Sequence, residues 1–135
     1  MNPDSGSAAN VLGSVVNGTV DFICGGGTVY FNHCDLKLLP RGGNSDIIAA
    51  PATEPGRKYG YVFADCYIDG GEEQDGRFHL GRPWQKSPKA VFLNCSMNVV
   101  PANEGWSNMN GTIPSLFAEY NSTDGNFRLI DLNSL

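Results

Sequence analysis

The sequence predicts an all-β protein, a single-stranded parallel β-helix whose coils stack into a solenoid. The first observation is an internal repeat, which reads VYFNHCDL at 29–36, YVFADCYI at 61–68 and AVFLNCSM at 90–97. Each unit has a phenylalanine, two residues, a cysteine, one residue and then Leu, Ile or Met, and the units recur at intervals of 32 and 29 residues, as in solenoids. The second observation is composition, because 17 glycines and only 17% charged residues favour short strands joined by turns.

The repeat also predicts a corner in every coil. In a straight strand Phe31 and Cys34 would point to opposite faces, because their offset is odd. If both are buried, the backbone must turn between them, at Asn32-His33, and likewise at Ala64-Asp65 and Leu93-Asn94. The cysteines of the repeats then form an interior stack of small apolar groups. The alternative is three ordinary strands of a sandwich, but hairpin turns at a spacing of about 8–12 residues are scarce here.

The length of 135 residues suits one compact domain and is too short for two. We expect a flexible leader at 1–14, which is polar and lacks the basic region and apolar core of a secretory signal, and a solenoid domain at 15–135. The segments between the repeats, including PATEPGRK and the long DGGEEQDGRFHLGRPWQKSPK, are rich in turn residues. Such loops on one flank of a rigid solenoid commonly build a binding cleft. The late segment SLFAEYNS is strand-like.

Charge and motif content argue against several classes of function. The net charge of -5 disfavours a nucleic-acid partner, and no run of about 18 apolar residues offers a membrane span. The four cysteines include no C-x-x-C pair, so zinc and redox sites are poorly supported, and we expect no metal and no cofactor. His33 and His79 lie outside any nucleophile elbow or metal-binding pair.

The glycine run in GTVDFICGGG does not fit a phosphate-binding loop. No lysine follows Gly25, Gly26 and Gly27, and the next segment, TVYF, is a strand rather than a helix. We therefore interpret the run as a tight bend in which the missing Cβ atoms allow close approach.

Asp21, in the same stretch, is the candidate functional carboxylate. If Phe22 points inward, Asp21 lies on the outer face of the coil. Taken by itself, this residue is better described as a solvated carboxylate at a strand end. A candidate partner is Arg82, in a stiff turn between Gly81 and Pro83, whose guanidinium would hold the acid ionised and oriented. Trp84 offers a flat face suited to a sugar ring, although an aromatic that merely covers the coil is an equally good interpretation.

Taken in order, GTVDFICGGG, YGYVFADCYI, HLGRPW, AVFLNC and GWSNMN…FAEYNS resemble the pectin methylesterase family. The resemblance extends from about Val15 to Ser122. It implies a right-handed parallel β-helix that removes methyl groups from homogalacturonan (pectin) without a metal. It also implies an extracellular or periplasmic location, although the chain shows no signal peptide.

The resemblance assigns roles to three residues. Asp21 matches the nucleophile, Arg82 the arginine that hydrogen-bonds it, and Trp84 the aromatic that packs on the sugar. Cys24 departs from the aromatic residue that is common at its position in the plant enzymes.

Other parts of the family's site have no match in the chain. The family places an acid/base aspartate and oxyanion glutamines upstream of the nucleophile, where this chain has MNPDSGSAANVLGSVVNG. We do not assign that role to Asp4, and Gln74 and Gln85 do not match either. The chain thus resembles only the C-terminal portion of the family, and we expect a β-helix truncated at its N-terminal end, weakly active or inactive, that self-associates through an uncapped N-terminal coil. The alternatives are a non-catalytic galacturonan-binding module and a purely structural solenoid.

Overall fold

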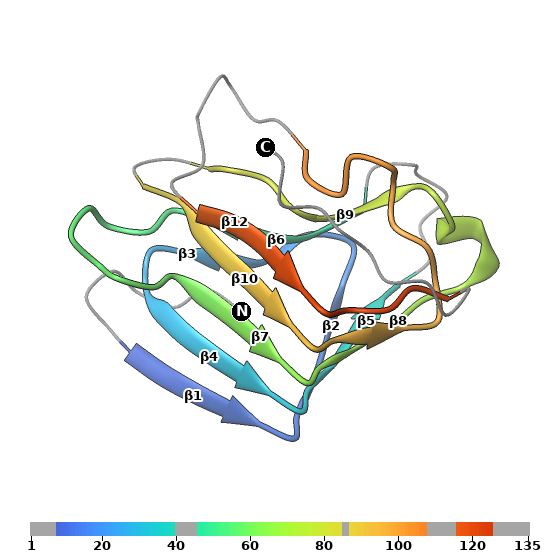
Figure 1. Cartoon of the computed structure of the whole chain (residues 1–135), viewed down its shortest axis with the longest axis horizontal. Helices are drawn as coiled ribbons and strands as arrows, with labels where there is room; N and C mark the ends of the chain where they lie inside the picture. Colours follow the sequence, from blue (N-terminus) through green and yellow to red (C-terminus); the bar gives the residue numbers. More distant parts are fainter. Residues whose placement is uncertain (1–7, 40–45, 85–86, 108–115, 126–135) are drawn as a thin grey trace.

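The computed structural model describes residues 8–39, 46–84, 87–107 and 116–125, and their strands form three parallel sheets (Figure 1). The first sheet contains, in spatial order, β1 (Ala8–Leu12), β4 (Thr28–Asn32), β7 (Tyr61–Ala64), β10 (Lys89–Leu93) and β12 (Leu116–Tyr120). The second contains β11 (Ser96–Met97), β8 (Tyr67–Asp69), β5 (Asp35–Leu38) and β2 (Val15–Gly18). The third contains β3 (Val20–Gly25), β6 (Asp46–Pro51) and β9 (Phe78–Gly81).

Successive coils pair with one another in parallel, which confirms the predicted β-helix and excludes the sandwich. Each strand of the first sheet lies next to the equivalent strand of the following coil, as in the pairs β1–β4, β4–β7, β7–β10 and β10–β12. A short 3-10 helix, η1 (Glu72–Gln74), lies between β8 and β9. In the described part of the chain no helix is long and apolar enough to cross a membrane.

The predicted corners are present in all three repeats. Phe31 and Cys34 are both fully buried, and His33 between them has a left-handed φ of 53°. Asp65 and Asn94 occupy the same position in the next two coils, with φ of 53° and 52°. Asn121 repeats the conformation after β12, with φ of 57°, so the strand in the late segment is followed by the same corner. Asp and Asn tolerate this conformation better than most other residues do.

The three repeat cysteines form the predicted interior stack, and each is tied to the preceding coil. The thiol of Cys34 donates to the carbonyl of Val11 at 3.4 Å, that of Cys66 to Phe31 at 3.5 Å, and that of Cys95 to Phe63 at 3.4 Å. The hydrogen bond with Cys66 and burial raise the pKa of the Cys95 thiol above its ordinary value. Cys95 is therefore a neutral, inert thiol that helps to fill the core.

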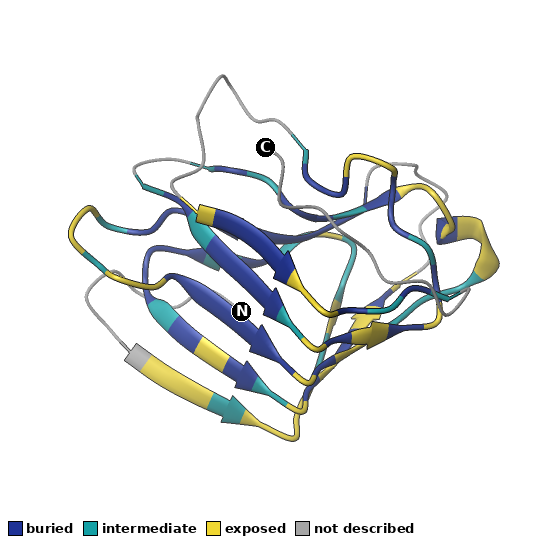
Figure 2. Cartoon of the chain, in the orientation of Figure 1, coloured by how far each residue is buried: buried dark blue, intermediate teal, exposed yellow. Residues whose placement is uncertain are grey.

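A second stack is formed by the repeat phenylalanines. The rings of Phe31 and Phe63 lie 4.8 Å apart and nearly parallel, and those of Phe63 and Phe92 lie 4.4 Å apart. All three side chains are fully buried. The two stacks lie on either side of the same corners and belong to one hydrophobic cluster. Figure 2 shows buried positions recurring in β4, β7, β10 and β12.

The described solenoid begins earlier than the expected boundary at residue 15. Strand β1 lies within the segment 1–14 and pairs with β4 over five residues, from Ala8↔Thr28 to Leu12↔Asn32. The sequence pattern could not indicate this strand, because Ala9, Asn10 and Leu12 are exposed and its backbone hydrogen bonds carry no sequence signature. The leader's remaining residues, 1–7, lie outside the described part of the chain.

Replacement of Phe63, the middle ring of the phenylalanine stack, should be strongly destabilising. Phe63→Ala removes a fully buried ring with neighbours on both sides, and a loss of about 3–5 kcal/mol in the free energy of unfolding is expected. Tyr67→Ala, at a residue of β8 that is 38% exposed, is the control and should cost less than about 1 kcal/mol. Chemical denaturation of the three proteins measures the difference, and equal losses would contradict the stacked core.

Candidate active site

Asp21 lies in a β-bulge, and the bulge decides where its side chain points. Between β3 and β6, Val20 pairs with Ile47 and Ile23 with Ala49, so β3 advances three residues while β6 advances two. Asp21 itself has a φ of 50°, a left-handed conformation that costs a non-glycine residue about 1–3 kcal/mol. Bulges of this kind re-aim a side chain next to a site.

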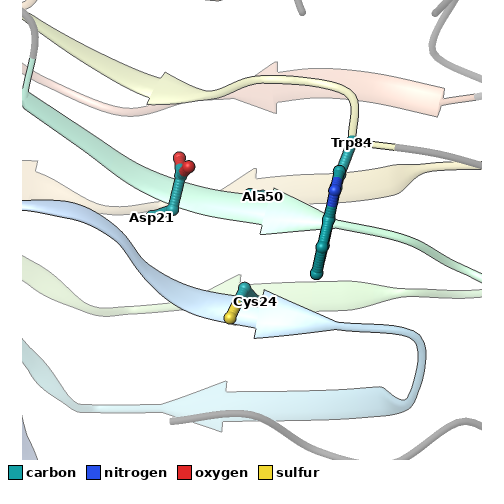
Figure 3. Close-up of a pocket in the computed structure, with 4 residues that line it drawn as sticks. All are labelled: Asp21, Cys24, Ala50 and Trp84. Atoms are coloured by element: carbon teal, nitrogen blue, oxygen red, sulfur yellow. The ribbon is translucent and has the colours of Figure 1, made fainter.

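The bulge changes which residues of β3 share a face. Ile23 is fully buried in the core and Phe22 packs partly buried against it, so two successive side chains are directed to the interior. Asp21 and Cys24 both line a pocket on the outside of the third sheet (Figure 3). The expected outer position of Asp21 therefore holds, but through an irregularity that simple strand alternation does not contain.

Arg82 and Asp21, 61 residues apart in the sequence, form a two-pronged ion pair. The Nε–H group of Arg82 donates to Oδ1 and Oδ2 of Asp21 at 3.0 and 3.1 Å, and Nη2 also donates to Oδ2. Both side chains are largely shielded from water, with exposed fractions of 26% for Arg82 and 22% for Asp21. The guanidinium fork therefore holds the carboxylate in one orientation.

The backbone after β9 places Arg82 and Trp84 beside β6. The amide of Arg82 donates to the carbonyl of Ala49 at 2.9 Å, and that of Trp84 donates to Pro51 at 3.2 Å. Gly81 allows this approach, because a Cβ there would lie only 3.1 Å from the Ala49 oxygen and 3.3 Å from the Trp106 ring. The segment GRPW thus extends the third sheet, with Arg82 directed at the bulge.

The pocket has a volume of about 210 Å³ and is lined by Asp21, Cys24, Ala50 and Trp84. In Figure 3 the Asp21 carboxylate points upward and the Trp84 indole extends down from the segment that follows β9, with Cys24 below and Ala50 between them. Pockets for whole drug-sized ligands are about 300–1,000 Å³, so this one suits a single sugar unit or its substituent. Ala50 was missed by sequence reasoning, because a small apolar residue in the run IIAAPA carries no chemical signal.

The glycine run acts at the back of this site. The carbonyl of Gly25 accepts hydrogen bonds from the Tyr61 hydroxyl at 3.0 Å and from the Ala52 amide at 2.9 Å. Gly25 has a φ of 122°, which only glycine adopts readily, and it ends β3 immediately after Cys24. Burial raises the pKa of Tyr61, so its hydroxyl stays a donor. The run is thus a bend between coils, as the sequence suggested.

The remaining polar candidates lie away from the pocket lining. The Nδ1 atom of His33 contacts Oδ1 of Asn32 at 2.7 Å, and Nε2 of His79 contacts Oε1 of Glu104 at 3.0 Å, which lowers the pKa of Glu104. Gln74 is buried and accepts the Gly71 amide through Oε1. Asp4 and Gln85 lie outside the described residues. Within residues 8–39, 46–84, 87–107 and 116–125 no group of three or more His, Cys, Asp or Glu could hold a metal ion.

Fold and site together define the class: a parallel β-helix whose third sheet carries an arginine-held aspartate facing a tryptophan. The family profile named Pectinesterase matches residues 12–127, and the chain belongs to this family. A probable pectinesterase/pectinesterase inhibitor of Arabidopsis thaliana is 32% identical over 127 residues, which cover 80% of this chain and 21% of that protein. A pectinesterase of Aspergillus niger is 29% identical, covering 82% of this chain and 36% of that protein.

Solved structures agree with this assignment. A pectin methylesterase in complex with a hexasaccharide superposes with a TM-score of 0.74 and 27% identity, over 96% of this chain and 46% of that one. The fold alone is matched by the Yersinia enterocolitica pectin methylesterase, with a TM-score of 0.84 and 23% identity, over 98% of this chain and 49% of that one. The fold is thus the right-handed parallel β-helix of these enzymes. The chain spans about a fifth of the length of the first plant relative and less than half of these structures.

The ion pair should be measurable as an energetic coupling. Asp21→Asn and Arg82→Gln, made singly and together, should show a coupling of about 1 kcal/mol in the free energy of unfolding, because the pair is mostly shielded from water. Asp35→Asn combined with Arg82→Gln is the control; Asp35 is exposed on β5 of the second sheet, and this pair should be additive. A coupling near zero for Asp21 and Arg82 in chemical denaturation would contradict the contact.

Proposed function

We propose that this chain carries the nucleophile-bearing part of a pectin methylesterase that hydrolyses methyl esters of homogalacturonan. The observation that carries the proposal is the Asp21 carboxylate, held by Arg82 at the edge of a sugar-sized pocket that Trp84 closes on one side. Family membership and the hexasaccharide complex of a related pectin methylesterase support the substrate class.

The chemistry begins with Asp21 as the nucleophile. One carboxylate oxygen attacks the carbonyl carbon of the methyl ester, and the π electron pair of the carbonyl group moves onto the carbonyl oxygen. Collapse of this tetrahedral species breaks the bond to the methoxy group and leaves a mixed anhydride between Asp21 and the galacturonate. Arg82 holds the attacking carboxylate in one orientation, and Trp84 packs against the sugar ring.

Completion of the cycle needs a second acid. The departing methoxide must take a proton from an acidic group to leave as methanol. That group, now deprotonated, must then remove a proton from the water that hydrolyses the anhydride. Asp21 is the only carboxylate among the four described residues that line the pocket. We therefore propose that this chain alone is an incomplete, weakly active or inactive esterase.

Methanol release from methylated pectin tests this proposal. The chain alone should release methanol at least about a hundredfold more slowly than a complete pectin methylesterase, because an acid/base group and oxyanion donors are each worth about that factor. Asp21→Asn should abolish any residual release, whereas Asp35→Asn, on the exposed face of β5, should not change it. Release at the rate of a complete enzyme would refute the incomplete site.

A galacturonan-binding module without catalysis and a structural solenoid are the alternatives. Calorimetric titration with methylated oligogalacturonides separates them in the same experiment. Binding that is lost in Trp84→Ala but retained in Tyr120→Ala, with no methanol at any concentration, would favour the module. No binding of either methylated or free oligogalacturonides would favour the structural role.

We further propose that the protein works outside the cytoplasm, in the extracellular space or the periplasm.

We also propose that the protein self-associates. Among the described residues, β1 and β2 are edge strands of their sheets. Leu12 in β1 and Val15 in β2 are 72% and 60% exposed. Unpaired strand edges next to apolar side chains favour pairing with another chain.

Self-association is expected to depend on Leu12 and Val15. Analytical ultracentrifugation at increasing concentration should detect dimers or larger species, and the double variant Leu12→Lys/Val15→Lys should shift them towards monomer. Tyr67→Lys, on the exposed face of β8 within the second sheet, is the matched control and should not. A wild-type monomer at all concentrations would contradict this proposal.

A further inference from the structure

The hydroxyl of Tyr61 is a buried polar group that the ester chemistry does not use. Tyr61 begins β7 in the first sheet and is fully buried in the core. Its hydroxyl nevertheless donates to the carbonyl of Gly25 at 3.0 Å, at the end of β3 in the third sheet. The equivalent positions of the neighbouring coils are Val29 in β4 and Ala90 in β10, whose side chains carry no polar group. Tyr61 thus departs from the repeat and places a hydrogen-bond donor across the interior of the solenoid.

The strand end that Tyr61 contacts consists of glycines. Residues 25–27 have no side chains that could anchor them, and glycine loses more conformational freedom on ordering than any other residue. The φ of Gly25 is 122°, and Figure 3 shows the chain turning back shortly after Cys24. The Gly25 carbonyl accepts the amide of Ala52 at 2.9 Å as well as the Tyr61 hydroxyl. This strand end is therefore ordered by donors that come from other coils.

The ring of Tyr61 is itself held firmly, so the position of its hydroxyl is well defined. The ring lies edge-on to Phe31, with centroids 6.3 Å apart and planes at 78°, and edge-on to Phe63, at 6.4 Å and 69°. Burial raises the pKa of Tyr61 above its ordinary value, and the charge of a Cys24 thiolate would raise it further. The hydroxyl is therefore a neutral, fixed donor.

The same strand end belongs to the pocket on the outer side of the third sheet. Cys24 directly precedes Gly25 and lines the pocket together with Asp21. Ala50, which pairs with Cys24 in the β3–β6 ladder, lines the pocket as well. Binding sites work when their groups are held within about 0.5 Å of the productive geometry. A strand end that is free to shift would therefore loosen the pocket lining.

We propose that Tyr61 is a positioning residue whose hydroxyl, from the core side, fixes the glycine end of β3 and so sets the place of Cys24 in the pocket lining. This inference rests on the proposed function, because it names a residue that shapes the pocket of that function without touching the substrate. The Gly25 carbonyl keeps its bond to the Ala52 amide when the hydroxyl is removed. The effect of removing the hydroxyl is therefore local, and the fold persists.

Alkylation of Cys24 with iodoacetamide under native conditions measures how firmly the strand end is held. Cys34, Cys66 and Cys95 are at most 2% exposed, whereas Cys24 is partly exposed, so peptide mass spectrometry follows Cys24 selectively. Tyr61→Phe, which removes only the hydroxyl oxygen, should accelerate this alkylation about fivefold, because the net contribution of one hydrogen bond corresponds to about that factor.

Two control variants and a second readout complete the experiment. Tyr67→Phe removes the hydroxyl of a tyrosine in β8 that is 38% exposed, and the alkylation rate should not change. Phe63→Leu loosens the core in the same strand as Tyr61, and it should lower the overall stability without changing the rate. Calorimetric titration with a fully methylated oligogalacturonide should show an affinity that falls about fivefold in Tyr61→Phe and stays at the wild-type value in both controls.

The outcomes separate this inference from the proposed function. An unchanged alkylation rate in Tyr61→Phe, or an equal acceleration in Phe63→Leu, overturns the positioning role, because the hydroxyl would then have no specific effect on the strand end. If Tyr61→Phe binds the oligogalacturonide as tightly as the wild type does, the role is overturned and the proposed function stands. If Cys24 reacts faster only in Tyr61→Phe but none of the proteins binds the ligand, the positioning role is supported and the proposed function is contradicted.

Discussion

The structure depends on one backbone constraint, a single left-handed residue at the corner between the first and second sheets. In the three repeats that residue is His33, Asp65 or Asn94, and it lets the phenylalanine before the corner and the cysteine after it both face the interior. Because every coil turns at the same place, phenylalanines stack on phenylalanines and thiols reach the carbonyls of the coil before. The strain of one residue per coil is offset by a continuous core.

Stacked coils make the third sheet a rigid platform, and the candidate site uses that rigidity. Asp21 comes from one coil and Arg82 from two coils later, yet parallel register holds their side chains in hydrogen-bond contact. The bulge at Asp21 and the close packing of Gly81 adjust the platform locally, one by turning a carboxylate outward and the other by letting GRPW follow β6. Asp21 thus adds a strained residue to the third sheet, where a rigid scaffold can hold it.

Charge is unevenly distributed around the same platform. The guanidinium of Arg82 is used by Asp21, whereas Arg57, Lys58 and Lys89 contact no carboxylate of the described residues. Arg57 and Lys58 lie in the segment that follows β6, and Arg82 lies in the segment that follows β9.

The sequence by itself determined the parts of this protein that repeat. The spacing of Phe31, Cys34 and their equivalents predicted the coil, its corner and the thiol stack, because burial at a fixed period must be written into every unit. The resemblance of VDFI and HLGRPW to pectin methylesterases predicted that Asp21 and Arg82 belong together. Only the tertiary structure decided how they meet, through a bulge at Asp21, the small residues Ala50 and Gly81, and a strand at 8–12. These features depend on backbone register between distant coils, and that register leaves no periodic mark in the residues concerned.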